Sequence, residues 1–248
     1  MTDPALQAAL YLEAVLPALP RLAAHDAPLA SALEGPDVAV SLYAPGALRA
    51  RVAIASGQAA VARESHPGDL RLWFPTHGQL IRAFDGAGRP ALALPFAGFS
   101  RLPRARRLVA AGKRLETLLN TRAPEHLPLH AWGNLLVGIQ AATTLLRRRA
   151  LAGPRLPLRG LVVFACPAFP SALWIDLAAL TTGTGEPAAP FAARVTFANL
   201  ATVLAELDHQ LDAPAALGLG TLRIEGHLPL AEALGQLMLQ AGQLLKPH

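Results

Sequence analysis

The stretch of sequence that decides the fold lies near the C-terminus and reads HQLDAPAALGLGTLRIEGHLPLAEALGQLM, residues 209–238. Within it, Leu222 and Ile224 alternate with charged residues between two glycines. A period of two is typical of a half-buried strand, and we expect that strand over 217–226. The leucines and alanines that follow predict a helix over 229–245. The chain therefore closes with a strand and a long helix.

The sequence upstream of this stretch predicts one long helix and then several strands. Apolar residues recur every three or four positions over 131–148, which predicts an amphipathic helix. The expected elements after it are strands at 160–165, 172–180 and 193–197 and a helix at 199–208. Several strands followed by helices predict an α+β fold, and not a doubly wound parallel sheet.

An internal repeat explains the length of the chain. Residues 72–84 (LWFPTHGQLIRAF) and 195–207 (VTFANLATVLAEL) both place the end of a strand just before a helical apolar stripe. Phe74 then matches Phe197, at an offset close to half of the 248 residues. Because self-similarity at a fixed offset indicates repeated units, we expect two tandem copies of one unit, over 1–122 and 123–248.

The first half has the same order of expected elements as the second. A helix over 5–16 is expected to end at Pro17 and Pro20, because proline removes a backbone donor. Arg49 and Arg51 take outward positions of an alternating segment, which predicts a half-buried antiparallel sheet. The expected elements here are strands at 38–42, 48–54 and 70–74, a helix at 78–85, an apolar run at 91–96 and a helix at 103–120.

Composition narrows the class of protein. The chain is 52% hydrophobic and 16% charged, which excludes disorder for most of it. It contains no run of about 18 uninterrupted apolar residues, so we expect no membrane-spanning helix. One cysteine, Cys166, excludes an internal disulfide and fits a reducing compartment. The first residues lack the pattern of a signal peptide, and we expect a cytoplasmic protein.

Positive charge is concentrated in one part of the chain. Residues 49–122 carry 13 basic and 4 acidic side chains, whereas residues 186–248 carry 3 basic and 6 acidic ones. The densest cluster consists of Arg101, Arg104, Arg106, Arg107, Lys113 and Arg114, and Arg147–Arg149 form a second one. Such clusters are typical of a solvated helix face or of a surface that approaches anionic lipid. Nucleic acid is not expected as a partner, because aromatic residues are only 5% and no nucleic-acid module is present.

Three motifs suggest chemistry but are better explained by structure. His126 and His130 are four residues apart, yet Pro128 between them argues against a helix that aligns them as metal ligands. Cys166 has no base in its sequence neighbourhood and is expected to be a buried thiol. Gly183-Thr184-Gly185 lacks the lysine of a phosphate-binding loop and predicts a hairpin connection. None of the three motifs therefore argues for a catalytic residue, a metal site or a phosphate-binding loop.

Residues 209–238 resemble the closing segment of the sterol carrier protein 2 (SCP2) sterol-binding domain. The positions that fit that family are Asp212, Gly220, Leu222, Ile224, Gly226, Leu230, Ala231 and Leu234. As an order of elements the resemblance extends over about 130–248. In the first half, residues 91–98 keep only Gly98 of the glycine-flanked strand pattern. The first half is therefore expected to be a degenerate copy.

The resemblance implies a mostly antiparallel sheet covered on one face by helices, with an apolar tunnel between them. It also implies a non-catalytic carrier of a fatty acyl, sterol-like or isoprenoid ligand, with no catalytic residue, no metal and no cofactor. The residues expected to line the tunnel are Trp174, Phe197, Leu204, Leu217, Leu222, Ile224, Leu234 and Met238. The same residues would fill an ordinary closed core. The alternatives are an accessory scaffold in a lipid or ubiquinone biosynthesis complex and an enzyme that uses Cys166. The sequence does not define the oligomeric state.

Overall fold

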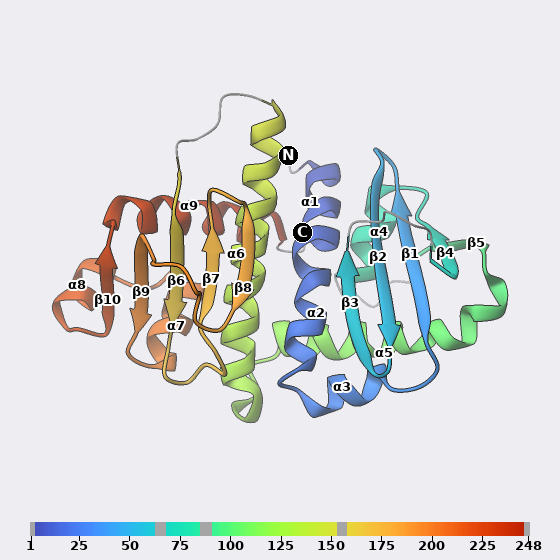
Figure 1. Ribbon diagram of the computed structural model, residues 1–248, viewed down its shortest axis with the longest axis horizontal. Helices are drawn as coiled ribbons and strands as arrows, with labels where there is room; N and C mark the ends of the chain where they lie inside the picture. The colour runs from blue at the N-terminus through green and yellow to red at the C-terminus, as the bar shows by residue number, and fades with distance from the viewer. Residues whose placement is uncertain (1–2, 63–67, 85–90, 153–157, 246–248) are drawn as a thin grey trace. The chain divides into compact units, whose positions relative to one another are not determined.

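The computed structural model describes residues 3–62, 68–84, 91–152 and 158–245. The chain divides into two compact units, one built mainly from Met1–Thr121 and the other from Arg122–Gln243. Each unit has its own five-stranded sheet (Figure 1). None of the helices within the described ranges combines the length and the apolar character needed to cross a bilayer.

The first unit places most of its helices before and after its strands. Its elements are α1 (Pro4–Leu10), the π-helical turn η1 (Tyr11–Val15), α2 (Leu16–Ala23), α3 (Ala27–Leu33), β1 (Val38–Ala44), β2 (Leu48–Ala55), β3 (Gln58–Ala62), β4 (Leu70–Trp73), α4 (His77–Phe84), β5 (Leu94–Ala97), the short helix η2 (Phe99–Arg101) and α5 (Leu102–Asn120). The strand order is β3-β2-β1-β4-β5, and only the central β1–β4 pair is parallel.

The second unit repeats this topology. Its elements are the short helix η3 (Pro124–His126), α6 (Leu127–Ala152), β6 (Leu161–Ala165), β7 (Leu173–Asp176), β8 (Thr181–Thr184), β9 (Ala193–Phe197), α7 (Leu200–Leu207), α8 (Ala213–Gly218), β10 (Leu222–Gly226) and α9 (Leu228–Leu245). The order is β10-β9-β6-β7-β8, again with one parallel pair, β6–β9.

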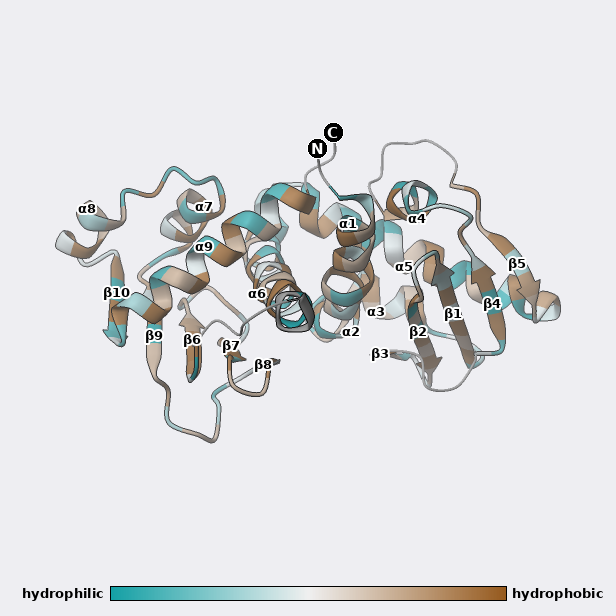
Figure 2. Ribbon diagram, turned by 90° about the horizontal axis from the view of Figure 1, so that it is seen from above, coloured by the Kyte–Doolittle hydropathy of each residue, from teal (hydrophilic) through white to brown (hydrophobic). Residues whose placement is uncertain are grey.

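The two sheets therefore match strand for strand, and the α+β fold with mostly antiparallel sheets is confirmed. Both bounds of α7 lie 123 residues after the matching bounds of α4, and β6 begins 123 residues after β1. This spacing is compatible with a tandem duplication. Figure 2 shows α4 and α5 on one side of the first sheet, and α7 and α9 on one side of the second.

The first helical segment differs from expectation, because it does not end at Pro17. It continues to Ala23 through the π turn, in which the backbone N–H of Leu16 bonds to the carbonyl of Tyr11 five residues earlier. A proline cannot donate to the carbonyl four residues before it. The wider π turn supplies a different hydrogen-bond pattern just before Pro17, and the helix survives.

Two further boundaries differ in the second unit. The segment expected as one strand over 172–180 is the strand β7 and a turn, and Gly183 belongs to the next strand, β8, rather than to a hairpin connection. The strand expected over 217–226 begins only at Leu222. Residues 213–218 form α8 instead, because the side chain of Asp212 accepts a hydrogen bond from Ala215 N at 3.0 Å and caps that helix.

Candidate functional site

The register of the second sheet determines which side chains point to its inner face, the face on the side of α7 and α9 (Figure 2). Leu222 pairs with Phe197, and Ile224 pairs with Val195, which in turn pairs with Phe164. Residues directly opposite each other point to the same face of a sheet. Phe197, Leu222 and Ile224, all expected to line the tunnel, therefore share one apolar face with the core residues of β6.

Trp174 lies on the opposite face of the sheet. It pairs with Val163, which pairs with Arg194 on β9, so these three side chains form one row. The indole lies across Gly183, where a Cβ atom would fall 2.0 Å from a ring carbon. The structure thus separates Trp174 from the other residues expected to line the tunnel, and we leave it out of the candidate site.

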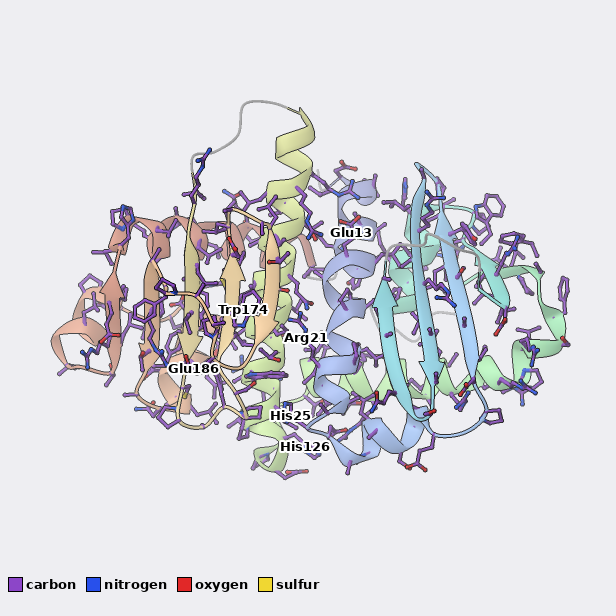
Figure 3. All side chains as sticks on the ribbon, viewed as in Figure 1. Glu13, Arg21, His25, His126, Trp174 and Glu186 are labelled. Carbon is purple, nitrogen blue, oxygen red and sulfur yellow. The ribbon has the colours of Figure 1, made fainter. Side chains whose placement is uncertain are left out.

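The face that carries Trp174 bears polar contacts at its surface, where the Glu186 side chain is 63% exposed. Both terminal nitrogens of Arg194 bond to the carboxylate of Glu186, the shorter contact being 2.8 Å. The Arg194 guanidinium also lies over the ring of Phe191. Figure 3 labels Trp174 and Glu186 over the second sheet. An ion pair and a cation–π contact on this side leave the apolar inner face as the candidate lipid site.

The helices α7 and α9 supply three more of the expected residues. Leu234 of α9 is fully buried, whereas Met238 is half-buried. Met238 lies against α6, where its Cε would be 3.1 Å from a Cβ atom placed on Gly138. Leu204 of α7 is also half-buried. The flexible Met238 thus fills the space left by a glycine at the crossing of α6 and α9.

Exposure is uneven across the candidate site. Phe197, Leu222 and Leu234 are almost completely buried. Ile224 is only half-buried although it points to the inner face, and Leu217 on α8 is 41% exposed. Among the expected residues, Leu217 on α8 is thus the most open, and Ile224 on the edge strand β10 is half-buried like Leu204 and Met238.

The cation cluster of α5 is divided between internal and external roles. Arg107 donates to the carbonyls of Leu33 and Pro36, and Arg114 forms a two-bond ion pair with the buried Asp26. Arg104, Arg106 and Lys113 are exposed, and Arg101 is half-exposed. The contacts of Arg107 and Arg114 therefore stabilise the first unit. Arg107 and Arg114 thus leave the group of six cations that the sequence predicts on a solvated or lipid-approaching helix face.

The two histidines that are four residues apart lie in different elements. His126 ends η3, and His130 is buried in α6. Contrary to expectation, Pro128 does not prevent a helix, because it lies in the first turn of α6 where its missing N–H would have no partner. Among the described residues, no group of three or more His, Cys, Asp or Glu could hold a metal ion. Cys166 is buried just after β6, in agreement with expectation.

Ionisable groups near the end of α7 are perturbed by their surroundings. Arg122 pairs with Asp208, with one N–O contact of 2.8 Å, and this hydrogen bond lowers the pKa of Asp208. Burial raises the pKa of Glu206, with a smaller opposite effect of His209. These shifts belong to the surface and to the flank of α7 and do not assemble an acid–base pair.

No protein-family model and no curated protein matches this chain. Solved structures that are similar include SCP2-like 2 from Aedes aegypti, at 22% identity and a TM-score of 0.29, over 41% of this chain and 97% of that chain. A palmitated form of that mosquito protein matches at 25% identity and a TM-score of 0.29, over 40% of this chain and 92% of that chain. SCP2 from Yarrowia lipolytica matches at 15% identity and a TM-score of 0.33, over 43% of this chain and 91% of that chain. These structures are domains of the family that residues 209–238 resemble.

Proposed function

We propose that the second unit binds the apolar chain of a lipid between the inner face of its sheet and the helices α7 and α9, and carries it without making or breaking a bond. The observation that carries this proposal is the incomplete cover of the edge strand β10. Ile224 points to the inner face but keeps contact with solvent. A half-buried apolar side chain beside a dry core is a place where hydrocarbon can gain contacts.

The first unit provides an internal comparison. Its inner face is formed by Val40, Val52 and Leu70, each fully buried, with Leu42 and Ile54 nearly so. Leu72, which pairs with Leu42 on the same face, is half-buried, as Ile224 is in the second unit. We propose that the first unit is a degenerate copy that contributes structure, while the second unit carries the ligand, because residues 91–98 keep only Gly98 of the glycine-flanked strand pattern that residues 220–226 retain.

The expected affinity follows from the buried area. A chain that buries about 300 Å² of hydrocarbon gains about 7 kcal/mol at about 25 cal/mol per Å². Ordering the ligand reduces this gain, so dissociation constants near the micromolar range are expected. Apolar walls discriminate poorly between hydrocarbons. The ligand class is therefore a fatty acyl, sterol-like or isoprenoid lipid rather than one defined molecule.

The test is uptake of a fluorescent fatty acid by the full chain, compared between two variants. Ile224→Glu places a carboxylate on the inner face and is expected to weaken uptake at least tenfold, because burying a charge beside hydrocarbon is unfavourable. Leu219→Glu is the matched control, since Leu219 precedes the same strand and is 79% exposed. Its uptake should equal that of the wild type. Thermal unfolding checks that both variants fold.

A second variant guards against misfolding of the first. Ile224→Trp keeps the site apolar but occupies its volume, and it should also reduce uptake. If neither the wild-type chain nor the Leu219→Glu control takes up the probe, the carrier proposal is wrong. Stable capture of an enzyme by a chain that takes up no lipid would favour the scaffold function instead.

A further inference from the structure

The first unit exposes a group of large apolar side chains that its own core does not use. Seven of the eleven exposed large apolar residues among the described ranges lie between positions 73 and 109. Five of them cluster around the edge strand β5, and we refer to them as the aromatic edge. They are Trp73, Leu94, Phe96, Phe99 and Leu102. Phe99, at 59% exposure, is the most open of the five.

The register places the strand residues of the aromatic edge on the face away from the core. Trp73 pairs with Tyr43 on one side and with Leu94 on the other. The ring of Phe96 meets that of Tyr43 edge to face, with centroids 5.4 Å apart. Val38, Val40 and Leu42 of β1 point to the opposite face, whereas Ala39 and Ser41 share the face of Tyr43 and are buried as well. Figure 2 draws β5 in brown at the border of the first sheet.

A tight turn brings the remaining two residues to the same border. Gly98 has a φ of +78°, and a Cβ atom there would fall 1.7 Å from the carbonyl oxygen of Asp69. Only glycine tolerates this approach. The chain therefore turns against the start of β4 and continues directly into η2 and α5, which carry Phe99 and Leu102.

Basic side chains surround the aromatic edge. Arg49 pairs with Tyr43, so it lies in the same cross-strand row, and Arg71 lies two residues before Trp73 on the same face. Arg101 and Arg104 stand at the N-terminus of α5, where the helix dipole disfavours positive charge. Residues 69–116 contain nine Lys and Arg and three acidic residues, and two of the nine, Arg107 and Arg114, are engaged inside the unit. Stabilisation of α5 therefore does not explain why Arg101 and Arg104 stand at this border.

The second unit shows that the fold does not require such an edge. The strand that corresponds to β5 is β10, which carries Arg223 and Glu225 on its outer face, bonded to each other at 2.6 Å. A charged edge strand is the ordinary solution for an exposed sheet border. The aromatic edge of the first unit therefore departs from the topology that the two units share.

We infer that the aromatic edge docks the first unit on an anionic membrane surface. Aromatic rings prefer the membrane–water interface, and surrounding arginines are attracted to acidic headgroups. Addition of a protein strand is disfavoured, because β5 has only four residues and includes Pro95. This inference concerns the first unit and stands apart from the lipid site proposed for the second.

The test is flotation of the full chain with vesicles of phosphatidylcholine, with and without about one third phosphatidylserine. The wild type should bind the anionic vesicles, and binding should weaken with salt. Phe96→Ser combined with Phe99→Ser should weaken binding about tenfold. So should Arg101→Glu combined with Arg104→Glu, because each charge near the surface contributes.

Matched variants in the second unit separate this surface from general hydrophobicity and charge. Leu219→Ser combined with Leu228→Ser removes two exposed apolar residues, and Arg159→Glu reverses an exposed cation, so neither should change flotation. Uptake of a fluorescent fatty acid by the Phe96 and Phe99 variant should stay at the wild-type level, which keeps the two proposals distinguishable. Absence of vesicle binding, binding that survives the serine replacements, or a dimer that these replacements dissociate would overturn the inference.

Discussion

The ion pair between Asp26 and Arg114 gives the sharpest prediction about stability. The carboxylate of Asp26 is buried and accepts both the Nε of Arg114 at 2.9 Å and its terminal nitrogen at 2.8 Å. It also caps α3 by accepting the backbone N–H of Leu29 at 2.9 Å. One side chain thus joins the start of α3 to the middle of α5, and Asp26→Ala removes both functions.

The magnitude follows from the two functions. Loss of a helix N-cap costs about 1 kcal/mol. Breaking a buried ion pair costs about 3–5 kcal/mol, and the lower end applies because the Arg114 side chain keeps 20% of its exposure. We expect Asp26→Ala to lower the free energy of unfolding of the first unit by about 3–4 kcal/mol. Asp26→Asn keeps a capping oxygen and should cost about half as much.

The assay is urea unfolding followed by circular dichroism, together with hydrogen–deuterium exchange of the amides in α3 and α5. Exchange assigns the loss to the first unit, which matters because a chain of two units need not unfold in a single step. A double-mutant cycle with Arg114→Leu should show that the two substitutions are not additive. Stability of Asp26→Ala within about 0.5 kcal/mol of the wild type would refute the reasoning.

Three further predictions concern the second unit. Gly183→Ala should lower the urea midpoint and shift the tryptophan emission, at a cost of about 1–3 kcal/mol, because its Cβ would displace the Trp174 ring; Trp174→Ala in the same chain should relieve the clash. Burial raises the pKa of Glu206 in the folded state, so ionisation of this carboxyl lowers the stability of the wild type as the pH rises above about 4. Glu206→Gln lacks this loss and should become more stable than the wild type over that range. Equal pH profiles of the two chains in thermal unfolding would contradict this. The opposite sign holds for Asp208, because its hydrogen bond to Arg122 lowers its pKa in the folded state. Its contribution to the free energy of unfolding is present at neutral pH and is lost as the pH falls below about 4. Asp208→Asn should therefore flatten the acid side of the same profile.

The sequence predicts the strands well where one face is buried and the other is not. In β2 the exposed Arg49 and half-buried Arg51 alternate with buried Ala50 and Val52, so the period of two is visible in the letters. The prediction from this period fails at residues 217–220, where Leu-Gly-Leu-Gly has the alternation of a strand. There the cap supplied by Asp212 decides for a helix, and a local hydrogen bond outweighs the pattern.

The site depends on information that a single segment does not contain. Trp174 stands between Leu173 and Ile175, and nothing in these residues tells which of them faces the helices. That choice follows from the pairing of β7 with β6, a contact between separate strands. The aromatic edge was not predicted either, because an apolar segment such as 91–96 is normally assigned to the core. Its signal in the sequence is the unusual proximity of Phe96 and Phe99 to Arg101.

The parallel central pair of each sheet has a consequence for how the chain assembles during synthesis. In the first unit β1, β2 and β3 are joined in order as antiparallel neighbours, so this meander can form as soon as it leaves the ribosome. The other side of β1 stays open until β4 arrives, because parallel neighbours need a longer connection. Until then, the nascent unit presents an unpaired strand, and the timing of translation past Trp73 sets how long that strand is exposed to other chains.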